Sequence, residues 1–168
     1  MQKKLPDTID FFKQVDRNAC YECVWPVQSF ERLKDVIYDN KGEVKARLKF
    51  GTRAGVRCLD GTVEADLELR CERCLDPVKY HIEGGFRFGL ISSDEEAGLL
   101  PEEFEPLIVT NAELSVIDLV EDELLLSLPI VAKHDEECSE VLQKHSNNGK
   151  TQHDTHRPFA ALKDLMNS

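Results

Sequence analysis

The residues best suited to chemistry are three pairs of potential metal ligands. These pairs are Cys71 and Cys74, Cys20 and Cys23, and His134 and Cys138. At these spacings, two ligands can supply half of a tetrahedral zinc shell. Joining the Cys71 pair to His134 and Cys138 would give three thiolates and one imidazole, whereas joining it to Cys20 and Cys23 would give four thiolates.

The other interpretation is that these cysteines are reduced thiols that bind no cofactor. The pairs are far apart for a compact zinc ribbon, and Leu75 replaces the small residue that zinc knuckles favour after the second cysteine. A redox motif of this kind would open a helix, but Leu75-Asp76-Pro77 and a further strand follow here. Structural zinc and free thiols therefore both stay open, and a redox role is disfavoured.

A run of basic side chains, which we call the basic strip, is a candidate RNA-binding surface. Its members are Lys41, Lys45, Arg47, Lys49, Arg53 and Arg57. Lys45, Arg47 and Lys49 alternate with apolar residues, so on a strand they would share one face and could follow RNA phosphates. Acidic residues of a nearby strand, at positions 64, 66 and 68, could instead neutralise the strip through cross-strand ion pairs.

The overall charge limits what this protein can bind. Its 21 Lys and Arg against 32 Asp and Glu give a net charge of −11, which repels nucleic acid and anionic membranes from the molecule as a whole. Most of the acidic excess lies in residues 91–140, which could bind a basic partner such as a ribosomal protein. We find no motif for a phosphate loop, nucleophile elbow or zinc protease, so the sequence predicts no enzyme. Without a membrane span or signal-peptide core, we expect a cytoplasmic protein with no membrane partner.

The hydrophobic pattern predicts an α+β fold. Alternating residues over 43–90 indicate an antiparallel meander, with a two-residue turn at Asp60-Gly61 and a bulge or bend at Gly84-Gly85. We therefore predict a curved antiparallel sheet or open barrel flanked by helices.

Three helices are expected around this sheet. The first is capped by Asp7 or Thr8 and the second by Ser29. Ser115 and Asp118 form a capping box that opens the third, which runs to about Leu126 with the acidic residues 121–123 on its solvent side.

The composition also divides the chain into three parts. Residues 1–139 are predicted to form a single α+β domain, 140–157 a flexible polar linker, and 158–168 a short C-terminal docking helix. The three residues expected on one face of that helix, as a partner-docking site, are Phe159, Leu162 and Met166.

Several motifs, taken in order along the chain, resemble the bacterial large ribosomal RNA subunit accumulation protein family. The motifs are Leu5-Pro6-Asp7-Thr8-Ile9-Asp10, Cys71-Glu72-Arg73-Cys74, Leu107-Ile108-Val109, Ile117-Asp118-Leu119, residues 121–129, His134, Cys138 and Pro158-Phe159-Ala160-Ala161-Leu162. The resemblance implies a cytoplasmic factor for the synthesis, processing or stability of large-subunit (23S) ribosomal RNA, without established catalytic residues. Cys71, Cys74, His134 and Cys138 match family positions and the Cys20 pair does not, so the resemblance favours the mixed thiolate and imidazole site.

Two functional hypotheses follow. In the first, a non-enzymatic ribosome-biogenesis factor binds pre-ribosomal RNA or an assembling particle through the basic strip. In the second, an adaptor without RNA affinity recruits an RNA-processing enzyme or a ribosomal protein through its acidic face and C-terminal helix.

Overall fold

A computed structural model describes residues 8–110 and 114–138 of the chain. The chain divides into one compact unit that ends at Lys133 and a second that begins at His134. Every helix and strand named below lies in the first unit. The expected linker over 140–157 and docking helix over 158–168 lie outside the described residues, and the domain boundary at 139 stays a prediction. Within the described ranges, we find no helix with the length and apolar character needed to cross a membrane.

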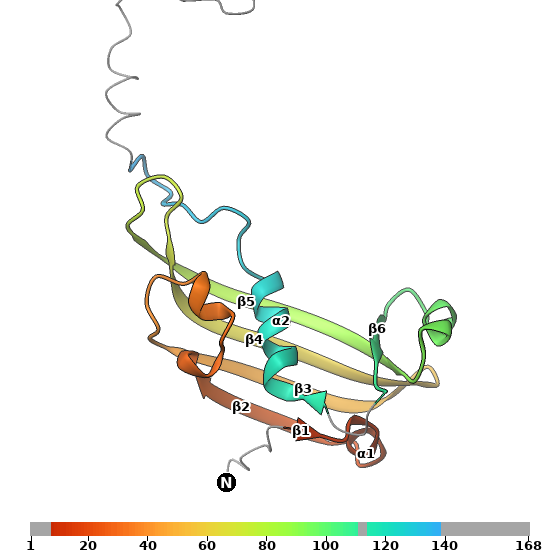
Figure 1. Ribbon diagram of the computed structural model, residues 1–168. Coiled ribbons are helices and arrows are strands. Elements are labelled where there is room, and N and C mark those ends of the chain that lie inside the picture. The colour runs from red at the N-terminus through yellow and green to blue at the C-terminus, as the bar shows by residue number, and fades with distance from the viewer. Residues whose placement is uncertain (1–7, 111–113, 139–168) are drawn as a thin grey trace, which may run out of the picture. The chain divides into compact units, whose positions relative to one another are not determined.

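The main element is a five-stranded sheet with the strand order β2-β3-β4-β5-β6 (Figure 1). Its strands are β2 (Cys20–Pro26), β3 (Glu43–Arg53), β4 (Val56–Arg70), β5 (Pro77–Ile91) and β6 (Glu105–Ile108). The first four are antiparallel to their neighbours, whereas β6 runs parallel to β5. The sheet is mixed and open rather than closed into a barrel, and the predicted α+β class is confirmed.

Short elements surround this sheet. They are β1 (Thr8–Ile9), which pairs with β7 (Leu114–Ser115), the helices α1 (Phe11–Asp16) and α2 (Val116–Leu126), and the 3-10 turns η1 (Val27–Ser29), η2 (Leu33–Asp35) and η3 (Asp94–Leu99). Figure 1 shows α2 lying across one face of the sheet. Its buried residues Val116, Val120 and Leu124 recur every fourth position and pack with the apolar face of the strands.

The turn predicted at Asp60-Gly61 is wrong, because both residues lie inside β4. Asp60 pairs with Arg87, and Gly61 pairs with Phe86. A Cβ atom at Gly61 would lie 2.0 Å from Cζ of Phe86, so glycine is needed here to leave room for an aromatic ring. The hairpin instead turns at residues 54 and 55, both of which have positive φ.

Of the bulge or bend predicted at Gly84-Gly85, the bulge is not formed. These glycines pair in regular register with Val63 and Thr62 of β4. A Cβ atom at Gly84 would lie 2.1 Å from Oγ of Ser127, the residue that caps the C-terminus of α2. The glycine therefore permits close packing of the helix end on β5.

The N-terminal helices differ from the sequence-based expectation. Thr8 lies in β1, and Asp10 is the residue that caps α1, with its Oδ1 accepting a hydrogen bond of 3.0 Å from the Lys13 amide. Near Ser29, where a second helix was expected, the chain forms only η1 and η2. Phe30, Leu33 and Ile37, which follow Ser29, are nevertheless buried, because tertiary packing rather than helical periodicity places them in the core.

Candidate metal centre and charged surfaces

The Cys-x-x-Cys motif lies in the tight turn between β4 and β5. The Cys71 amide donates to the Asp76 carbonyl at 3.0 Å, and the Leu75 amide donates to the Cys71 carbonyl at 2.8 Å. Leu75 has a φ of +68°, the left-handed conformation that a small residue normally adopts. From the sequence, it was doubtful that a leucine after the second cysteine could adopt the backbone of a zinc knuckle. Leu75 nevertheless has this left-handed conformation, and its side chain is exposed.

The segment after α2 is held against this turn by three hydrogen bonds. The Glu72 amide donates to the Ala132 carbonyl at 2.8 Å. The Tyr80 hydroxyl donates to the Lys133 carbonyl at 2.9 Å and accepts from the Lys133 amide at 3.0 Å. Since His134 follows Lys133 directly, these bonds bring the chain back to the Cys-x-x-Cys turn just before the histidine.

The structure groups the four predicted ligands. One ligand atom from each of Cys71, Cys74, His134 and Cys138 lies within 4.8 Å of all the others. Zinc–sulfur bonds of about 2.3 Å would place tetrahedral ligand atoms roughly 3.8 Å apart. Cys71 is buried and the other three are half-buried. Three sulfurs and one imidazole nitrogen in this arrangement could hold a metal ion.

The alternative four-cysteine site is not formed. Cys20 and Cys23 lie on β2, where Cys20 is exposed and Cys23 is buried, so they point to opposite faces of the sheet. Through β3, Cys23 is level with Val63 of β4. Cys71 lies eight residues further along the chain, directly after the end of β4, which is roughly 26 Å at the rise of an extended strand.

The basic strip is mostly occupied by ion pairs and ring contacts. Its contacts are Lys41 with Asp39 at 2.7 Å, Lys45 with Glu64 at 3.6 Å, Arg47 with Glu22 at 2.7 Å, Arg53 with Asp60 at 3.6 Å, and Arg57 stacked 4.9 Å from the centre of the Phe12 ring. Lys49 is exposed and has no ion-pair partner among the described residues. Lys45, Arg47 and Lys49 share the outer face of β3, as their alternation predicted.

Further ion pairs connect β4 and β5 on the same face. Arg87 Nε donates to Oδ1 of Asp60 at 2.5 Å, and this hydrogen bond raises the pKa of Arg87. His81 Nδ1 lies 2.9 Å from Oδ1 of Asp66, and that hydrogen bond raises the pKa of His81 above its ordinary value of 6.5. The outer face therefore alternates acidic and basic groups.

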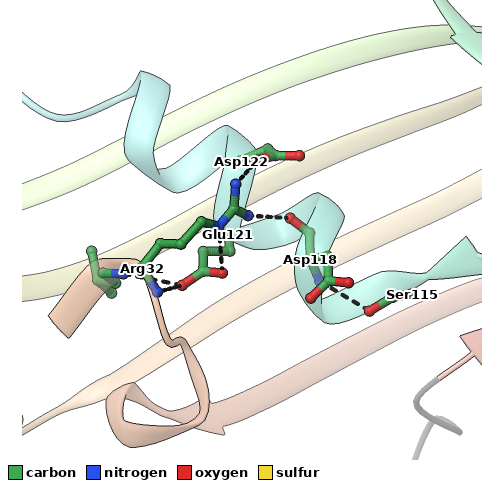
Figure 2. A network of polar contacts seen from close by, with 6 residues as sticks. Arg32, Ser115, Asp118, Glu121 and Asp122 are labelled. Carbon is green, nitrogen blue, oxygen red and sulfur yellow. Dashed lines mark hydrogen bonds and ion pairs between the residues drawn. The ribbon is translucent and has the colours of Figure 1, made fainter. Parts of the chain in front are cut away.

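A polar network between η2 and α2 was missed by the sequence analysis (Figure 2). Glu121 was expected on the solvent side of α2, but it is buried. Its Oε1 accepts hydrogen bonds from the Arg32 and Leu33 amides at 2.8 and 3.0 Å, and its Oε2 accepts from Arg32 Nε at 3.0 Å. Hydrogen bonds to Asp122 and Glu121 raise the pKa of Arg32. No local motif marks this network, because its partners are 88 to 90 residues apart.

Fold and site together define an α+β protein with an open mixed sheet and a cysteine–histidine cluster. A family model described as large ribosomal RNA subunit accumulation protein YceD matches residues 59–166. A protein of the same description from Haemophilus influenzae is 32% identical over 171 residues, which cover 98% of each chain. The chain therefore belongs to the YceD family of large ribosomal RNA subunit accumulation proteins, as its ordered motifs predicted. No solved structure matches the chain.

The residues that the family model matches include one of the two candidate sites and not the other. Residues 59–166 include all four candidate metal ligands and the whole of α2. Every member of the basic strip, from Lys41 to Arg57, lies before this range. The relative from Haemophilus influenzae nevertheless aligns over nearly the full chain, so the earlier strands also have a counterpart in that protein.

Proposed function

We propose that this protein supports the accumulation of large-subunit (23S) ribosomal RNA in the cytoplasm without catalysing a reaction, by binding pre-ribosomal RNA or an assembling ribosomal particle. The observation that carries this proposal is the relative named for large ribosomal RNA subunit accumulation, which is similar over 98% of both chains.

The basic strip is the proposed RNA contact. Its ion pairs are solvent-exposed, and such pairs contribute about 0–1 kcal/mol each, so a phosphate can replace the carboxylate partner at little cost. Lys49 lies beside Arg47 on the same face and is exposed. With a net charge of −11, this contact must be local, and contacts to proteins of the particle must contribute to the affinity.

The adaptor function is the second candidate. It is favoured by the ion pairs within the basic strip, by the position of the strip before the matched residues, and by six acidic and no basic side chains in residues 94–105. Such an adaptor would bind a basic ribosomal protein or an RNA-processing enzyme rather than RNA.

The function itself is tested in cells that lack the protein. We expect the ratio of 23S to 16S ribosomal RNA to fall and to recover when the wild-type chain is supplied. An unchanged ratio would contradict the proposed function.

The mode of binding is tested with purified protein and a fragment of large-subunit ribosomal RNA over a salt series. If the strip binds RNA, charge reversal of Lys45, Arg47 and Lys49 to Glu abolishes salt-sensitive binding. A matched control reverses three exposed basic residues elsewhere, namely Arg17, Lys34 and Arg70. Equal losses in both variants would show only a net-charge effect. No binding at low salt would favour the adaptor.

The cysteine–histidine cluster is proposed to hold a structural zinc ion. When bound, zinc would link the β4–β5 turn to the segment that follows α2, with three thiolates and one imidazole as ligands. We expect about one zinc per purified chain by elemental mass spectrometry, and much less in Cys74→Ser and Cys138→Ser. Cys20→Ser is the matched control and should retain the metal. Metal-free wild-type protein that folds with unchanged thermal stability would contradict this role.

A further inference from the structure

A groove with polar and apolar lining in similar measure lies between η3, the β3–β4 turn and α1. Its apolar lining comes from Phe12, Val56, Leu90, Ile91, Leu99 and Leu100. Its volume is about 230 Å³, comparable to that of roughly seven or eight liquid waters. The groove can therefore accept one large aliphatic or aromatic side chain.

The walls of this groove are fixed by packing. Leu100 packs directly on β5, where a Cβ atom at Gly89 would lie 2.8 Å from the leucine Cδ2. Elsewhere in the lining, the Arg57 guanidinium stacks on the Phe12 ring. Leu99 forms the rim and is 83% exposed. An exposed leucine beside a groove that is lined partly by apolar side chains is typical of a protein-binding site.

The charge around the groove selects its occupant. Glu96 is the acidic residue of the lining, and Asp94 and Glu95 precede it on the same 3-10 turn, η3. Of these three, Glu96 accepts a hydrogen bond from the Ser92 amide, whereas Asp94 and Glu95 are exposed and have no ion-pair partner within the described part of the chain. Arg57 is the single basic residue of the lining. At η3 the three acidic side chains outnumber the one arginine of the lining, so this end of the groove favours Lys and Arg over phosphate groups.

We propose that this groove binds one large apolar side chain from a Lys- and Arg-rich segment of a partner protein. The apolar side chain enters beside Leu99, and its basic neighbours pair with Asp94 and Glu95. This inference rests on the proposed function, because it assigns to the acidic surface the basic protein contacts that a factor acting on ribosomal particles requires.

The test uses two fluorescein-labelled peptides of equal charge, Lys-Lys-Arg-Ser-Trp-Ser-Arg-Lys-Lys and the same peptide with Ser in place of Trp. Fluorescence anisotropy with the full-length protein should show about tenfold or greater preference for the Trp peptide. Leu99→Ser should remove most of that preference, and Asp94→Lys with Glu95→Lys should weaken both peptides by about tenfold or more. The matched control, Glu31→Lys with Asp35→Lys, changes the same charge at exposed positions on η2 and before it.

Equal affinity for the two peptides, no binding at low salt, or equal weakening by the control variant would each overturn the groove proposal. None of these results bears on ribosomal RNA accumulation in cells. An unchanged ratio of 23S to 16S RNA in cells that lack the protein would instead overturn the proposed function, whatever the peptides do. The two failures are therefore distinguishable.

Discussion

The buried carboxylate of Glu121 should be a principal determinant of stability. Its side chain is only 6% exposed, and it accepts hydrogen bonds from two backbone amides and from the Arg32 guanidinium. In Glu121→Ala, the Arg32 and Leu33 amides would each lose their acceptor, which costs about 1–3 kcal/mol per group. With the lost ion pair, we expect the free energy of unfolding to fall by about 3–5 kcal/mol.

Two further variants separate the parts of this effect. In Glu121→Gln, the amide oxygen can keep both backbone hydrogen bonds while the NH2 group faces Arg32 Nε, so we expect an intermediate loss of about 1–3 kcal/mol. Asp122 also pairs with Arg32, but its side chain is 54% exposed. Asp122→Ala should therefore cost less than about 1 kcal/mol.

The assay is urea unfolding followed by the fluorescence of Trp25, the single tryptophan of the chain. The Trp25 ring packs edge-on to the Phe30 ring, with 6.2 Å between the ring centres. Because Phe30 is only two residues before Arg32, the fluorescence reports on the region of the network. Far-ultraviolet circular dichroism of the sheet checks that unfolding remains two-state. A loss below about 1 kcal/mol in Glu121→Ala, or equal losses in the Glu121→Ala and Asp122→Ala variants, would refute the reasoning.

Three other measurements test the fold. Gly61→Ala should destabilise the protein by about 1–3 kcal/mol in urea unfolding, because its Cβ atom would overlap the ring packed above it. His81 should titrate above 6.5 by NMR and move back toward that value in Asp66→Asn. The stabilisation from this pair is present below pH 6.5 and is lost as the pH rises through the raised pKa. Alkylation should modify exposed Cys20 quickly and Cys58 slowly, since burial raises the Cys58 pKa and lowers its thiolate fraction.

The sequence allowed those elements to be predicted whose signal is local. Period-two alternation identified β3, and the capping box identified α2, whose Ser115 Oγ accepts from the Asp118 amide at 3.2 Å. Both signals depend on residues within a few positions of each other. Cys71 and Cys74 were likewise visible as a pair, because both lie in one short turn.

Features that depend on distant residues could not be predicted. Asp60-Gly61 has a strong turn sequence, but a phenylalanine from β5 decides that the glycine stays inside a strand. Glu121 lies among acidic neighbours, and its burial is made favourable by the amides of residues 32 and 33 and by the Arg32 guanidinium. In both cases, tertiary contacts override a correct reading of local preference.

The position of the family match bears on how the protein contacts its partners. The match begins at residue 59, so it contains the cysteine–histidine cluster, α2 and η3 but leaves out the whole basic strip. The strip does have a counterpart in the relative from Haemophilus influenzae, which aligns over 98% of both chains, but it lies outside the part that the family model matches. The ion pairs of the strip point the same way, because Lys45 and Arg47 already have carboxylate partners. We therefore expect protein contacts on an assembling particle to contribute more than phosphate contacts.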